Sequence, residues 1–166
     1  MQLKVQIAED AARGKKPASN PAGLPIEKQV QFYISQFEDI DAQQFSNPGE
    51  PIVVSGVISM GKGTAASDAL VKIGRPAVPG LIGLLDDRRV TRSVGYMRIY
   101  DHNPQVLRYQ DIVIKCIEAI VDVHFYSPSH SGSFLSNEDK QKHDGVVADV
   151  RAWWKAHGTG ADIKGP

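Results

Sequence analysis

The sequence is poor in the features that mark disulfide-bonded, membrane-spanning or nucleic-acid-binding proteins. Its 166 residues contain a single cysteine, Cys116, which excludes an intramolecular disulfide and a cysteine-based metal site. No apolar run approaches the roughly 20 residues that a membrane-spanning helix needs, so no membrane association is expected. Nineteen basic residues balance nineteen acidic ones, which disfavours nucleic acid as a partner. These absences favour a cytoplasmic protein, although a chain that starts after a removed export signal would have the same composition.

The length predicts one domain with a substantial core, flanked by less regular ends. Residues 1–24 are rich in glycine, proline and lysine and are expected to be a tail or a peripheral strand. Residues 25–157 carry helical periodicity and form the predicted domain, and residues 158–166 are expected to be a C-terminal tail. Residues 3–7 and 52–58 have strand character and would form a small β-pair with each other.

Apolar residues at three- and four-residue spacing predict three long helices, over about residues 25–41, 107–122 and 138–157. Pro25 suits the first position of the first helix, and Ser136 or Asn137 is expected to cap the last one. The wide apolar stripe of the middle helix predicts burial on two sides. The segments between these helices, at 86–106 and 123–136, are expected to be loops.

Residues 66–87 organise this pattern, because they predict two short helices folded back on each other. Ala66, Ala69, Leu70 and Ile73 occupy positions i, i+3, i+4 and i+7 of the first helix. Gly74 follows as the residue that ends it in a left-handed conformation. Val78, Leu81, Ile82 and Leu85 repeat the same spacing in the second helix. Neither helix is long enough to be stable alone, so both need neighbours.

This stretch resembles the short bacterial type of HEAT-like repeat. There, a helix that ends in Leu-x-x-Ile-Gly is followed by one that begins Pro-Ala-Val-Pro-x-Leu-Ile-x-Leu-Leu, as residues 70–74 and 76–85 do here. The match covers residues 66–87 and weakens beyond them. The resemblance implies an all-α, irregular HEAT-like α-superhelical stack of about five helices, used for protein–protein contact or scaffolding. It implies no catalytic residue.

A second motif, just upstream, fits the phosphate-binding loop of nucleotide-using enzymes. Gly56, Gly61, Lys62, Gly63 and Thr64 match the pattern G-x-x-x-x-G-K-G-T, which is similar to the loop of adenylate kinases. Such a loop would cradle phosphates with backbone N–H groups at a helix N-terminus. The apolar interior of the loop and the short helix after it favour an ordinary glycine-rich turn.

Arginines and aromatic residues gather in the expected loop at 86–106. They could contact an anion or an acidic partner, since guanidinium groups match carboxylates and phosphates. The alternative is that the arginines pair with neighbouring aspartates and hold the loop in place. Near the C-terminus, one of the adjacent Trp153 and Trp154 is expected in the core and the other at an interface. The candidate contact residues are Arg88, Arg89, Arg92, Tyr96, Arg98 and Trp154.

The sequence therefore predicts a non-catalytic interaction or structural module with an unidentified protein partner and no cofactor. Two alternatives stay open: a nucleotide-binding enzyme that uses residues 56–64, and an anion- or nucleic-acid-binding protein that uses residues 88–98. His124 and His130 flank a Ser/Pro segment but lack a third ligand at metal-binding spacing.

Overall fold

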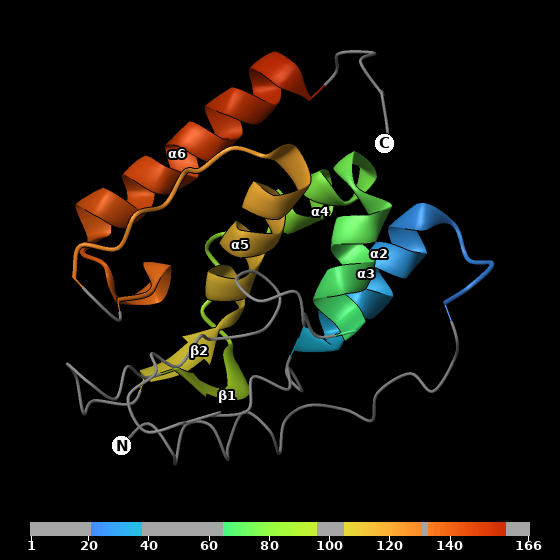
Figure 1. The fold of residues 1–166 in the computed structure, drawn as a ribbon, viewed down its shortest axis with the longest axis horizontal. Helices are drawn as coiled ribbons and strands as arrows, with labels where there is room; N and C mark the ends of the chain where they lie inside the picture. The colour runs from blue at the N-terminus through green and yellow to red at the C-terminus, as the bar shows by residue number, and fades with distance from the viewer. Residues whose placement is uncertain (1–20, 38–64, 96–104, 131–132, 159–166) are drawn as a thin grey trace.

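The computed structural model describes residues 21–37, 65–95, 105–130 and 133–158. Within these residues the fold consists of α-helices and one small antiparallel sheet (Figure 1), so the predicted all-α class with a β-pair is confirmed. None of the described helices is long and apolar enough to cross a membrane. The helices are α2 (Ile26–Ser35), α3 (Ala65–Ile73), α4 (Val78–Ile82), α5 (Tyr109–Val121) and α6 (Lys140–His157).

α3 and α4 form the predicted pair of short helices. α3 ends at Ile73, and Gly74 follows with φ 74° and ψ −146°, a conformation that side chains disfavour and glycine adopts freely. A 3₁₀ turn, η2 (Arg75–Ala77), then leads into α4. Leu70, Leu81 and Leu85 have no exposed surface, because the apolar positions of both helices face the core. The periodicity therefore located both helices within a few residues.

α5 is the centre of the core. Its side chains from Ile112 to Ile114, together with Cys116 and Ile117, are buried around most of the helix circumference. α3 and α4 both pack on α5, and α2 packs on α3, η2 and α4. Val146, Val147 and Val150 of α6 join the same hydrophobic cluster, so the described helices share one core. Figure 1 shows α5 between the α2–α4 group and α6.

The sheet lies where a loop was predicted. β1 (Val90–Gly95) pairs antiparallel with β2 (Gln105–Arg108), with an irregularity in register between Val90 and Val94. The loop prediction for residues 86–106 is therefore wrong at β1 and at the start of β2, and α5 begins at Tyr109, two residues later than the expected 107. The β-pair predicted from residues 3–7 and 52–58 lies outside the described residues.

The cap and the tryptophans of α6 differ from the prediction. Its N-cap is Asp139, whose carboxylate accepts a hydrogen bond from the Lys142 N–H at 2.9 Å. Ser136 was expected as a cap, but its hydroxyl donates instead to the buried Asp111 carboxylate at 2.8 Å. Trp153 and Trp154 are both half-buried, so neither lies fully in the core.

Buried carboxylates hold the connection between α5 and α6, residues 122–139. The carboxylate of Glu118 accepts hydrogen bonds from the backbone N–H groups of Phe125 and Tyr126, each at 2.8 Å. The carboxylate of Glu138 accepts from the Tyr126 hydroxyl at 2.9 Å and the Ser129 N–H at 2.8 Å. Hydrogen bonds to an ionised acceptor are the stronger kind, so these groups add to the apolar contacts that Tyr126 and Leu135 of this connection make with the core.

Candidate functional site

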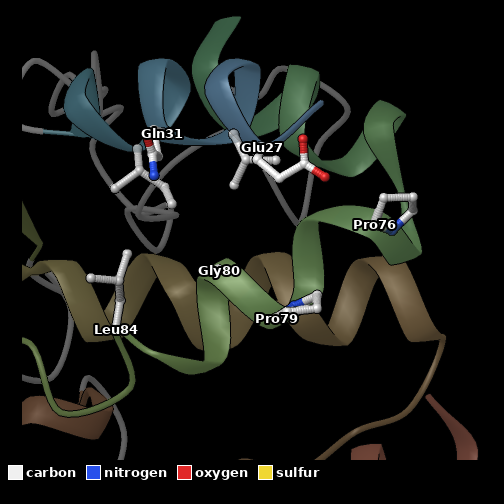
Figure 2. Close-up of a pocket in the computed structure, with 8 residues that line it drawn as sticks. Glu27, Gln31, Pro76, Pro79, Gly80 and Leu84 are labelled. Carbon is white, nitrogen blue, oxygen red and sulfur yellow. The ribbon is translucent and has the colours of Figure 1, made fainter. Parts of the chain in front are cut away.

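An open groove lies between α2 and α4, with a volume of about 570 Å³. Figure 2 shows Glu27 and Gln31 of α2 facing Pro76, Pro79 and Leu84 across it. Val30, Ile34 and Gly80 complete the lining, which is mainly apolar. The groove exists because α2, far from α4 in the sequence, packs directly beside it.

The floor of the groove depends on the close approach of the two helices at Gly80. A Cβ atom at this position would lie 3.0 Å from Cγ1 of Val30 and 3.9 Å from Cδ1 of Ile34. The missing side chain therefore lets these two residues of α2 lie against the backbone of α4. Pro79 precedes Gly80 without strain, because the N–H groups of a first helical turn have no partner within the helix.

Glu27 is the one ionisable residue in the lining of the groove. Its carboxylate has no hydrogen bond or ion pair among the described residues, and the residue is exposed. Two large apolar side chains lie close by in the sequence, since Leu24 is 42% and Ile26 is 45% exposed. The region around the start of α2 thus combines uncovered apolar surface with one unpaired negative charge.

The residues predicted to bind phosphate, Gly56, Gly61, Lys62, Gly63 and Thr64, lie outside the described residues. The helix that follows them is α3, which has 9 residues and ends before the conformationally special Gly74. Its N-terminal residues Ala66 and Ser67 are buried.

Only part of the predicted arginine cluster is described. The Arg89 guanidinium binds both carboxylate oxygens of Asp87, with the shortest contact at 2.6 Å, and lies 4.2 Å from the ring centre of Tyr109. Arg88 is exposed, and its carbonyl oxygen accepts a hydrogen bond from the Arg108 guanidinium. The Arg92 side chain, and Tyr96 and Arg98 entirely, lie outside the described residues. Arg89 therefore pairs with a neighbouring aspartate, as the alternative to anion binding predicts. The guanidinium of Arg88 has no partner among the described residues.

Trp154 belongs to a separate cluster near the end of α6. The Arg75 guanidinium lies 5.7 Å from the ring centre of Trp153 and 5.4 Å from that of Trp154, and it donates to the His157 carbonyl. This contact attaches η2 to α6. Among the described residues Trp154 has no hydrogen bond or ring contact with Arg88 or Arg89.

The titratable groups of the core have structural partners or are shielded. Burial raises the pKa of the Cys116 thiol to about 12, which makes it unreactive. Burial also raises the pKa of Asp111 above its ordinary 3.8, although Arg108 and Ser136 donate hydrogen bonds to it. Outside the core, the exposed His124 contacts Ser127 and Glu118. No group of three or more His, Cys, Asp or Glu side chains in the described ranges is placed to hold a metal ion.

Comparisons of the chain with models of protein families, with curated proteins and with solved structures found no match. The HEAT-like resemblance of residues 66–87 therefore stays a prediction from the sequence.

The sequence did not reveal the groove, although part of its signal was present. Pro76 of η2 and Pro79 and Gly80 of α4 are exposed, whereas Leu81 is buried, and charged residues are usual on such an outward face. An outward helix face without charge is typical of a covered or contact surface. The contribution of α2 could not be read in the same way, because it depends on packing between segments about 50 residues apart.

Proposed function

We propose that the protein is a non-catalytic interaction module that binds an amphipathic helix of a partner protein in the α2–α4 groove. The observation that carries this proposal is the mainly apolar lining of the groove with one unpaired carboxylate, Glu27. Uncovered apolar surface rimmed by polar groups is typical of interaction sites. The HEAT-like resemblance supports the same function, because such stacks serve in protein contact.

The shape of the groove favours a helix as its occupant. Two neighbouring helices leave a linear groove between them, and a third helix can place its apolar side chains along this groove. The matching sequence has apolar residues at positions i, i+3 or i+4, and i+7. A lysine or arginine at the edge of that apolar face would pair with Glu27, so the preferred partner helix is basic there.

Selection from a displayed library of helical peptides tests this function and requires no identified partner. The expected consensus carries the apolar spacing and a basic residue. The variant Glu27→Lys should weaken the selected peptides by about fivefold to tenfold, because an attraction of up to ~1 kcal/mol becomes a repulsion. A parallel selection on Glu27→Lys should then enrich acidic residues at the same position.

A matched pair of substitutions locates the binding surface. Gln31→Arg places bulk and positive charge in the groove and should weaken binding by a factor of ten or more. Gln141→Arg makes the same change at an exposed position of α6 and should have no effect. The proposal fails if no peptide is enriched, if Gln141→Arg acts as strongly as Gln31→Arg, or if the groove proves to be covered by a second copy of the chain or by another segment of the same chain.

A further inference from the structure

A second pocket, of about 330 Å³, lies where three distant segments meet. Its walls come from the turn after α4, the start of α5 and the start of α6, including Asp86, Arg88, Gln110 and His143. Two hydrogen bonds to backbone carbonyls hold the first two segments together: the Gln110 N–H donates to the Asp87 carbonyl at 3.2 Å, and the Arg108 guanidinium donates to the Arg88 carbonyl. The pocket is separate from the α2–α4 groove and shares no residue with it.

Gln110 is the feature of this pocket that internal packing leaves unexplained. The residue has no exposed surface, yet neither its amide nitrogen nor its amide oxygen has a hydrogen-bond partner among the described residues. A buried polar group without a partner destabilises a fold, so native proteins have few of them. An apolar residue of the same size would fill the space at lower cost. The amide therefore points to a ligand that presents both an acceptor and a donor.

The charges around the pocket show which sign that ligand carries. Each acidic group in the wall already has a partner: Asp86 binds Arg151 at 2.8 Å, and Asp144 binds Lys140. Glu138 accepts hydrogen bonds from Tyr126 and Ser129. By contrast, the guanidinium of Arg88 has no described partner, and His143 is in contact with Asp144 through Nδ1 alone. The unsatisfied groups are thus one cation, one imidazole nitrogen and one amide.

We propose that this pocket binds a small anion that carries a hydroxyl group next to its carboxylate or phosphate. The oxyanion binds the Arg88 guanidinium, whose fork of N–H donors matches such groups. The Gln110 amide donates to the oxyanion through Nε2 and accepts from the ligand hydroxyl through Oε1. A water molecule takes up about 30 Å³ of liquid, so the volume suits a ligand of roughly ten non-hydrogen atoms. That size is smaller than a nucleotide.

Calorimetric titration of the full chain with defined probes tests the site. Glycerate and glycerol phosphate represent the two oxyanions, propionate and propyl phosphate lack the hydroxyl groups, and adenosine monophosphate is too large. We expect either glycerate or glycerol phosphate to bind at least tenfold more tightly than its hydroxyl-free counterpart and than the nucleotide. Which of the two binds identifies the oxyanion. The absence of saturable binding by both at millimolar concentration would overturn the proposal.

Three variants separate a binding role from a structural one. Gln110→Leu should raise the melting temperature and abolish the preference for the hydroxylated probe, whereas a structural role predicts a lower melting temperature. Should Gln110→Leu fail to fold, Gln110→Met serves the same purpose with a flexible side chain. Arg88→Gln, at an exposed position, should weaken binding tenfold or more, and Lys155→Gln makes the same charge change at a distant exposed position of α6 without effect. Binding that survives both the Gln110 and the Arg88 substitutions would contradict the proposal.

Discussion

Apolar side chains hold the hairpin region, residues 65–85, against α5, whereas the connecting segment, residues 122–139, combines apolar contacts of Tyr126 and Leu135 with hydrogen bonds to two carboxylates. In the hairpin region Leu70, Leu81 and Leu85 have no exposed surface. In the connecting segment Glu118 and Glu138 accept hydrogen bonds from backbone N–H groups and a tyrosine hydroxyl. The two regions therefore differ in that the connecting segment also depends on hydrogen bonds to charged side chains. The two regions should respond differently to substitution and to pH.

The largest effect is expected from a charge in the hairpin region. Leu81→Asp places an unpaired carboxylate in a position with no exposed surface and should abolish cooperative thermal unfolding. Ile73→Asp should be less damaging because Ile73 is half-buried, and Lys72→Asp, at an exposed position of α3, is the control. Circular dichroism during heating measures the effect. A normal melting curve for Leu81→Asp would contradict the helix assignment.

A loss of about 2–4 kcal/mol in the free energy of unfolding is expected from Glu118→Ala, because two backbone N–H groups lose a charged acceptor. Glu118→Gln keeps an acceptor oxygen and should lose roughly half as much. Chemical denaturation measures both variants, and hydrogen exchange should accelerate at the amides of Phe125 and Tyr126. If these amides stay protected in Glu118→Ala, the carboxylate does not hold the connecting segment.

A smaller effect is expected from pH through Glu138. Burial acts to raise the pKa of Glu138, but the hydrogen bonds from Ser129 and Tyr126 and the charge of Lys142 outweigh it, so the pKa lies below the ordinary 4.5. The carboxylate therefore stabilises the fold above about pH 4.5, and this contribution is lost as the pH falls through the lower, folded-state pKa. The raised pKa of Asp111 acts in the opposite direction, because its burial favours the protonated form.

Melting curves at several acidic pH values isolate the Glu138 contribution. The wild type should lose stability more steeply below pH 4.5 than Glu138→Gln, by at most about 1.4 kcal/mol per pH unit for one proton. Asp144→Asn is the control, since Asp144 has its own lowered pKa but is exposed. If stability falls equally steeply with pH in the wild type and in Glu138→Gln, the hydrogen bonds to Glu138 do not cause the loss of stability in acid.

The smallest effect concerns Cys116, which lies on α5 between the two regions in the sequence. A rise in its pKa from 9.0 to about 12 leaves about a thousandfold less thiolate at neutral pH. A thiol reagent should therefore label the folded protein extremely slowly and the unfolded protein readily. Rapid labelling under native conditions would show that the core around α5 opens easily.

Local patterns made the hairpin region predictable. The apolar spacing and Gly74 locate α3 and α4, because the residues that determine a helix face and a helix end are close together in the sequence. The same kind of signal located α5 and the end of α6 at His157. Burial of α5 around most of its circumference followed from the width of its apolar stripe.

Contacts between distant residues made the rest unpredictable. β1 forms because it pairs with β2, and its charged neighbours hide its strand character in the sequence. Ser136 was a reasonable cap for α6, but its hydroxyl donates a hydrogen bond to the buried Asp111, which lies 25 residues away in the sequence. The groove requires α2 beside α4, and the pocket around Gln110 requires three segments to meet. The uncharged stretch at Pro76, Pro79 and Gly80 is a partial local signal for the groove, and the pocket has none.

Amide chemical shifts during titration with a selected peptide test the proposed function most directly. With a basic amphipathic helix, the shifts are expected to saturate and to centre on Glu27, Gln31, Gly80 and Leu84, which line the α2–α4 groove. In the Gln31→Arg variant the same shifts should require at least tenfold more peptide. Shifts that centre on α6 or that never saturate would contradict binding in the groove.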